Sequence, residues 1–134
     1  MLRMNYWAIV AAAVAAFVFS SVYYGVLGQE VIKLHADPAA AAATLKPAPW
    51  KVLVELARSL LVAYVLARFV ALLEISDWRS ALGLAVWMWI GFSFVLWVGS
   101  VMWENVPVKL AAIHAGDWLL KTVLIAVILA VWRK

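Results

Sequence analysis

The chain has 134 residues, of which 69% are hydrophobic and only 13% are charged. A soluble domain of this size leaves much of its surface in water, so this composition excludes a soluble globular class and predicts one transmembrane domain, 1–134. The formal charge of +4 comes from basic residues scattered near the ends of apolar runs, which favours anionic lipid over nucleic acid as a partner, and the absence of cysteine excludes disulfides and thiolate sites.

The first apolar run covers about 6–27, close to the ~20 residues that cross a bilayer. A signal peptide is the alternative, since Arg3 precedes an alanine-rich stretch. The run ends in tyrosines and not in a small-residue cleavage site, so we expect a retained span. Small residues on one face of this helix predict close packing against another helix. These helix-packing residues are Ala8, Ala12, Ala15 and Ala16, with Ala11 beside them.

The first connection, 28–49, is long and contains signals for a short helix outside the membrane. Asp37 is a good N-cap, Pro38 suits the first helical position, and the alanines that follow are the best helix formers. We expect this helix to end before the proline-containing segment at 46–49.

Three further apolar runs cover about 50–73, 78–103 and 110–132, and the connections between them are very short. Short links make consecutive helices antiparallel neighbours. Pro107 fits the start of the last helix or the turn before it. The sequence therefore predicts an all-α integral membrane protein, a four-transmembrane-helix antiparallel bundle with a short extramembrane helix between helices 1 and 2.

Tryptophan and basic residues give the expected orientation. Most of the nine tryptophans lie near the ends of apolar runs, where they anchor helices at the membrane interface. The deeper ones are Trp87, Trp89, Trp97 and Trp118. Lysine and arginine favour the side of the two termini by one residue, which predicts cytoplasmic termini.

Charged residues inside the predicted spans are the candidate functional residues. Glu55 and Arg58 share one face of the second helix, and His114, Asp117 and Lys121 share one face of the fourth. Intramembrane charges are costly and mark ligand sites or proton paths. The alternative is a purely structural ion-pair cluster that fixes helix packing. If the second and fourth helices are adjacent, the residues can form one network.

Catalysis and metal binding have little support in the sequence. No phosphate-binding glycine loop, nucleophile elbow or paired-histidine zinc motif is present. A lone internal histidine with one or two carboxylates makes a poor metal ligand set, so no metal or other cofactor is expected. Ser20 and Ser21 are expected to bond back to their own helix and not to act as nucleophiles.

Short motifs along nearly the whole chain resemble a known family. They are Met4-Asn5-Tyr6-Trp7-Ala8-Ile9, Tyr23-Tyr24-Gly25, Trp103-Glu104, Lys109-Leu110 and His114-Ala115-Gly116. In this respect the chain is similar to the bacterial family catalogued as domain of unknown function 1761, which often has asparagine where this chain has His114. The resemblance implies a four-helix protein of the bacterial inner membrane and brings no established activity.

Two functions remain open from the sequence. The first is binding or transport of a small ligand or of protons through the polar cluster, by a homodimer. The second is an accessory subunit that packs against a larger membrane complex. The alanine face and the many tryptophans favour this hypothesis. The expected partners are membrane lipids and either a second copy or another membrane protein, and no enzyme activity is expected.

Overall fold

The computed structural model describes residues 4–43 and 47–132, and all regular elements within these ranges are helices, which confirms the all-α prediction. The helices are α1 (Tyr6–Leu34), α2 (Pro38–Ala43), α3 (Pro49–Leu72), α4 (Trp78–Met88), the π-helical segment η1 (Trp89–Phe94), α5 (Val95–Trp103) and α6 (Val108–Val131). The segments α4, η1 and α5 follow one another directly and form one long helix.

Three of the described helices are long and apolar enough to cross a membrane: α1, the continuous Trp78–Trp103 helix and α6. They contain 29, 26 and 24 residues, against the ~20 that a bilayer requires. Helix α3 also has 24 residues, but Glu55, Arg58 and Arg68 interrupt its apolar sequence. Its role as a fourth span therefore stays a prediction.

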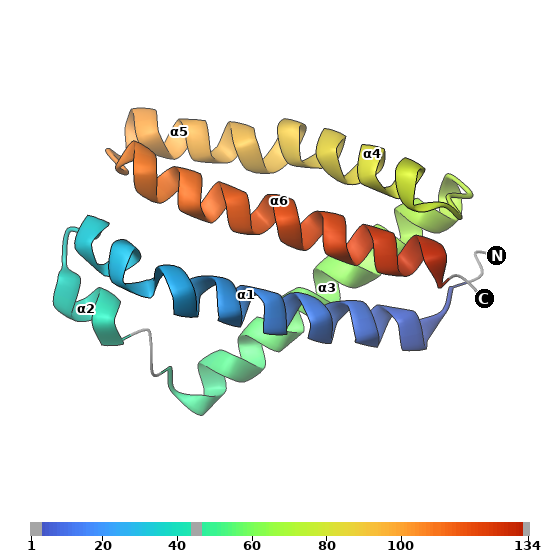
Figure 1. The fold of residues 1–134 in the computed structure, drawn as a ribbon, viewed down its shortest axis with the longest axis horizontal. Coiled ribbons are helices and arrows are strands. Elements are labelled where there is room, and N and C mark those ends of the chain that lie inside the picture. The colour runs from blue at the N-terminus through green and yellow to red at the C-terminus, as the bar shows by residue number, and fades with distance from the viewer. Residues whose placement is uncertain (1–3, 44–46, 133–134) are drawn as a thin grey trace.

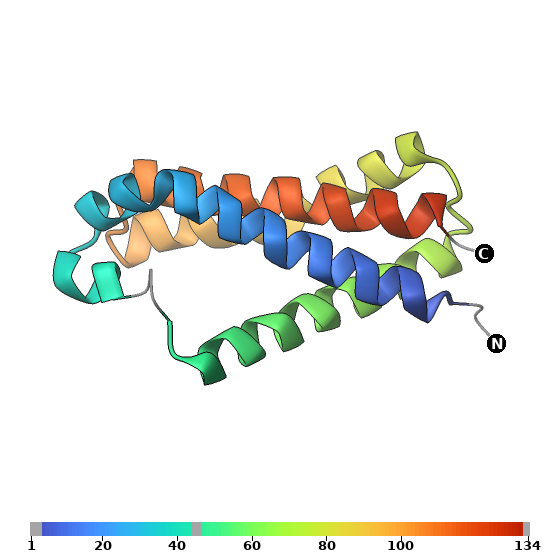
Figure 2. The same cartoon turned by 60° about the horizontal axis from the view of Figure 1, so that its bottom comes forward.

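The helices differ in how they are arranged (Figures 1 and 2). Helix α6 lies between α1 and the α4–α5 helix, and these three run side by side along the molecule. Helix α3 crosses them obliquely, so a regular antiparallel four-helix bundle is not confirmed. Where α1 begins and α6 ends, Asn5 Nδ2 donates a hydrogen bond of 3.2 Å to the Trp132 carbonyl.

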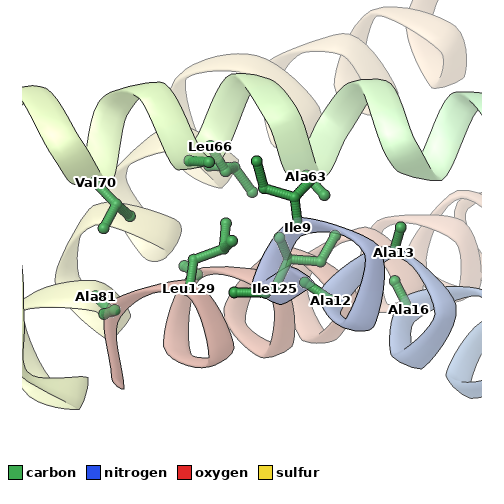
Figure 3. Close-up of a cluster of buried hydrophobic side chains, with 14 of the residues drawn as sticks. Ile9, Ala12, Ala13, Ala16, Ala63, Leu66, Val70, Ala81, Ile125 and Leu129 are labelled. Atoms are coloured by element: carbon green, nitrogen blue, oxygen red, sulfur yellow. The ribbon is translucent and has the colours of Figure 1, made fainter. Parts of the chain in front are cut away.

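The core is built mainly from alanine (Figure 3). Small side chains let helix backbones approach closely, and packing of this kind holds helices together in lipid. Of the predicted packing residues, Ala8, Ala12 and Ala16 are buried and Ala15 is half-buried. Ile9 and Ala13 are buried as well and widen the packed face of α1. The other members of this core include Ala63, Leu66 and Val70 of α3, Ala81 of α4, and Ile125 and Leu129 of α6.

The expected connection at 28–49 is wrong over 28–34, where α1 continues to Leu34. Gln29, Glu30 and Lys33 end the apolar run but are good helix formers, so polarity changes without ending the helix. Glu30 also forms an ion pair of 3.1 Å with Lys109 at the start of α6, which holds this end of α1 in place.

The other helix ends follow the expected signals. Asp37 precedes α2, and its carboxylate accepts a 3.2 Å hydrogen bond from the Ala40 amide. Pro107 is the residue just before α6, as predicted. The predicted end of the short helix at 46–49 falls partly outside the described residues. The π-helical segment in the middle of the third run was not expected.

Candidate functional site

A cavity of ≈ 580 Å³ lies where α3 diverges from the other helices. Its walls come from α1, α2, α3, α5 and α6, and its volume is typical of small-molecule sites. The first ten residues of α3, 49–58, include no buried residue, and burial begins at Ser59. The oblique path of α3 therefore opens the cavity. All of the predicted polar candidates line it: Glu55, Arg58, His114, Asp117 and Lys121.

Asp117 and Lys121 form a buried ion pair at the inner side of this cavity. Their Oδ2 and Nζ atoms are 3.3 Å apart, and the side chains are only 3% and 7% exposed. One helical turn separates the residues, so α6 alone places them together. The Ser20 hydroxyl of α1 donates a 2.7 Å hydrogen bond to the other carboxylate oxygen. The Lys121 ammonium lies 3.9 Å from the centre of the Trp118 ring, a cation–π contact.

Glu55 and Arg58 form a second, more exposed pair on α3. The distance from Nη1 of Arg58 to Oε2 of Glu55 is 2.6 Å, and the side chains are 58% and 40% exposed. An exposed pair contributes little to stability. This bond uses one of the five N–H donors of the guanidinium. Arg58 therefore keeps donors for a further anionic group.

His114 lies between aromatic residues of two other helices. Its Nδ1 atom is 2.6 Å from the Tyr24 hydroxyl of α1. Its ring stacks on Trp97 of α5, with ring centres 4.9 Å apart and planes 17° from parallel. These contacts fix the imidazole against the cavity wall, and they link α1, α5 and α6 at one level.

Two side chains attach to the backbone of α6 beside the cavity. The Tyr23 hydroxyl donates to the Ile113 carbonyl at 2.6 Å, and the Trp89 indole N–H donates to the Ala115 carbonyl at 2.8 Å. Gly116 makes room for the first of these, since a Cβ atom there would lie 2.8 Å from the Tyr23 hydroxyl. Trp89 opens the π-helical segment, and such segments are common at functional sites.

The structure brings the predicted residues together around one cavity, and residues of α1 take part in holding them there. Ser20 of α1 bonds to Asp117, and Tyr24 of α1 bonds to His114. Within the described part of the chain, the predicted residues form two ion pairs and the His114–Tyr24 contact. The prediction that Ser20 bonds back to its own helix is wrong, because the buried carboxylate of Asp117 is a stronger acceptor. Ser21 does bond back, to the Phe17 carbonyl at 2.8 Å, as predicted. In the part of the chain that is described, no three His, Asp or Glu side chains come together as metal ligands.

Apolar helices of this length around a polar interior are typical of multi-pass membrane proteins. The chain belongs to the family described as "Protein of unknown function (DUF1761)", whose family model matches residues 7–130. This match confirms the resemblance seen in the sequence and covers α1 to nearly the end of α6. The comparisons with curated proteins and with solved structures found no match.

Proposed function

We propose that this protein binds a small ligand in the cavity between α1, α3 and α6. The observation that carries the proposal is the ≈ 580 Å³ cavity lined by every polar candidate residue. A cavity of this size with a few polar groups and aromatic walls is the usual form of a ligand site. Two ion pairs, one buried and one exposed, give the site an inner and an outer end.

Ligand binding fits the arrangement better than proton transfer does. A proton path needs a continuous series of hydrogen-bonded groups. The bonds described around His114 lead to Tyr24, and those around Asp117 lead to Ser20 and Lys121, so the two groups are separate in the described part of the chain. A ligand in the cavity would contact both groups.

The proposal includes a location and an assembly. In it, α3 is the fourth span of an antiparallel bundle in the bacterial inner membrane, with cytoplasmic termini. Its charged residues Glu55 and Arg58 line the cavity and so avoid lipid. A second copy would pack on α1, where an exposed valine ridge runs along the helix. The ridge consists of Val10, Val14, Val18 and Val22.

The test is to block the cavity and measure what remains bound. Ser21 lines the cavity, and its hydroxyl bonds only within its own helix, so Ser21→Trp fills space at little structural cost. Leu96 of α5 is 68% exposed and lies outside the cavity and the valine ridge, so Leu96→Trp is the matched control. Native mass spectrometry after extraction in mild detergent should show a bound small molecule on wild type and Leu96→Trp. Ser21→Trp should lack it. Equal occupancy in all three proteins would contradict the proposal.

A further inference from the structure

Three hollows meet at one residue, Trp118. It lines the ≈ 580 Å³ cavity, a narrow gap of ≈ 10 Å³ next to Arg58 and Lys121, and a groove of ≈ 260 Å³ between α3 and η1. Val62 lines both the gap and the groove. Helix α6 takes part in all three hollows, since it contributes Trp118 to each. The cavity and the groove therefore adjoin at the Trp118 side chain.

The cavity and the groove differ in polarity. The cavity holds the ion pairs, hydroxyl groups and imidazole described above. The groove is lined mainly by apolar and aromatic residues: Leu61, Val65, Leu66, Met88, Trp89 and Phe92. Its Thr122 hydroxyl donates to the Trp118 carbonyl of its own helix at 2.6 Å, which leaves the groove a nearly apolar surface. A ligand that fills both the cavity and the groove must be amphiphilic.

The charges of the cavity select the head of such a ligand. Its lining includes the cations Lys51, Arg58 and Lys121 and the carboxylates Glu55 and Asp117, an excess of one positive charge with the histidines neutral. Lys121 and Asp117 neutralise each other at 3.3 Å. Arg58 retains guanidinium donors, and guanidinium geometry suits phosphate. The complementary head group carries one negative charge, and the cavity has room for further polar groups on that head.

We propose that the cavity and groove together bind one single-chain phospholipid with a monoanionic head, of the lysophosphatidylglycerol type. The phosphate lies against Arg58, the hydroxyl-bearing head occupies the cavity, and the single acyl chain runs past Trp118 into the groove between α3 and η1. One chain is expected because the groove that adjoins the cavity at Trp118 has a volume of only ≈ 260 Å³. This inference rests on the proposed function and names its ligand class.

The experiment uses delipidated full-length protein in a neutral detergent, with binding measured by native mass spectrometry. The probes are lysophosphatidylglycerol, zwitterionic lysophosphatidylcholine, and glycerol 3-phosphate, which has no acyl chain. Lysophosphatidylglycerol should bind at least about tenfold more tightly than lysophosphatidylcholine, whose choline cation would enter a cavity that already has an excess of positive charge. Glycerol 3-phosphate should bind at least about tenfold more weakly as well, because it lacks the acyl chain that fills the apolar groove.

Two variant pairs on α3 locate the head and the tail. Val65 lines the groove and is 39% exposed, whereas Val54 is 49% exposed and lies outside the three hollows, so Val65→Trp should weaken binding and Val54→Trp should not. Arg58→Gln should weaken the binding of lysophosphatidylglycerol about tenfold. Arg68 is on the same helix and outside these hollows, so Arg68→Gln should leave the affinity for lysophosphatidylglycerol unchanged. Each variant is first checked for wild-type thermal unfolding, and the two pairs test the site independently.

Each contrary result has a separate meaning. Equal binding of glycerol 3-phosphate, with no effect of Val65→Trp, overturns the amphiphile and leaves a cavity that binds polar ligands. Equal binding of lysophosphatidylcholine overturns the anionic head. Binding that survives Ser21→Trp overturns the cavity as the head site. If no probe binds while Ser21→Trp still removes a native bound molecule, this inference fails and the proposed function stands.

Discussion

Replacing Lys121 with methionine removes the ammonium that lies 3.3 Å from the buried carboxylate of Asp117. Methionine keeps an unbranched side chain of similar length, so the change mainly deletes the charge. Asp117 would keep the hydrogen bond from Ser20 at 2.7 Å but would lose its counter-charge while only 3% exposed. Breaking a buried ion pair by removing one partner costs about 3–5 kcal/mol. We expect Lys121→Met to lower the free energy of unfolding by that amount.

The double variant separates charge from packing. Adding Asp117→Asn removes the stranded carboxylate, and the asparagine carbonyl oxygen can still accept from Ser20. Replacing a whole buried pair is often close to neutral, so the double variant should lie within about 1–2 kcal/mol of wild type. The double variant should thus be more stable than Lys121→Met alone. That order is the signature of an ion pair that is buried in the folded protein.

The measurement is equilibrium unfolding in mixed micelles, followed by the fluorescence of the nine tryptophans. Arg58→Met is the matched control, because it breaks an ion pair whose arginine side chain is 58% exposed and should change stability by less than about 1 kcal/mol. If Lys121→Met costs no more than this control, or if the double variant is the least stable protein, the reasoning is refuted.

Three further predictions concern single contacts. Gly116→Ala should be close to neutral, because alanine favours the helix by about 1 kcal/mol but displaces the Tyr23 hydroxyl, whose bond contributes about as much. In a Tyr23→Phe background the same change should stabilise by about 1 kcal/mol in thermal unfolding, and an equal effect in both backgrounds would contradict the clash. Ser20→Ala should cost about 1.5–3 kcal/mol, the value of a bond to a charged group, whereas Ser21→Ala should stay within about 0.5 kcal/mol by denaturant titration. Asp77 caps α4, and the bond from the first-turn amide lowers its carboxyl pKa below the usual 3.8. The stabilisation of the folded protein by the ionised Asp77 cap is therefore present above pH 3.8 and is lost as the pH falls through the folded-state pKa. Stability measured against pH should show this loss in wild type and not in Asp77→Ser.

Local features of the fold and site could be predicted because they depend on spacing within one helix. Both ion pairs are three or four residues apart on α3 and α6, so helical geometry alone brings their charges together. The cap at Asp37 and the position of Pro107 just before α6 follow from residue type at a helix start. The burial of much of the alanine face follows from the small size of its residues.

Features that depend on how two helices meet could not be predicted. Ser20 shows no sequence signal for reaching Asp117, since 97 positions separate them. Tyr24 was visible only as part of a family motif, and its contact with His114 requires α1 and α6 to be adjacent. The oblique path of α3 depends on where its buried residues lie, from Ser59 to Ala71. The average hydrophobicity of that run contains no such information.

The placement of those buried residues divides α3 into a packed C-terminal part and an N-terminal segment that can rotate about it. The part of α3 from Ser59 onward is packed against α1 and α6, and the segment from Pro49 to Arg58 extends away from this packed part. At ~1.5 Å per residue the segment is about 15 Å long, and a rotation of ~10° about its packed end moves the tip by roughly 2.6 Å. Glu55 and Arg58 are on this segment, so a small rotation changes the distance between the outer ion pair and the buried one. Spin labels on the segment and on α6 should report the width of the cavity directly.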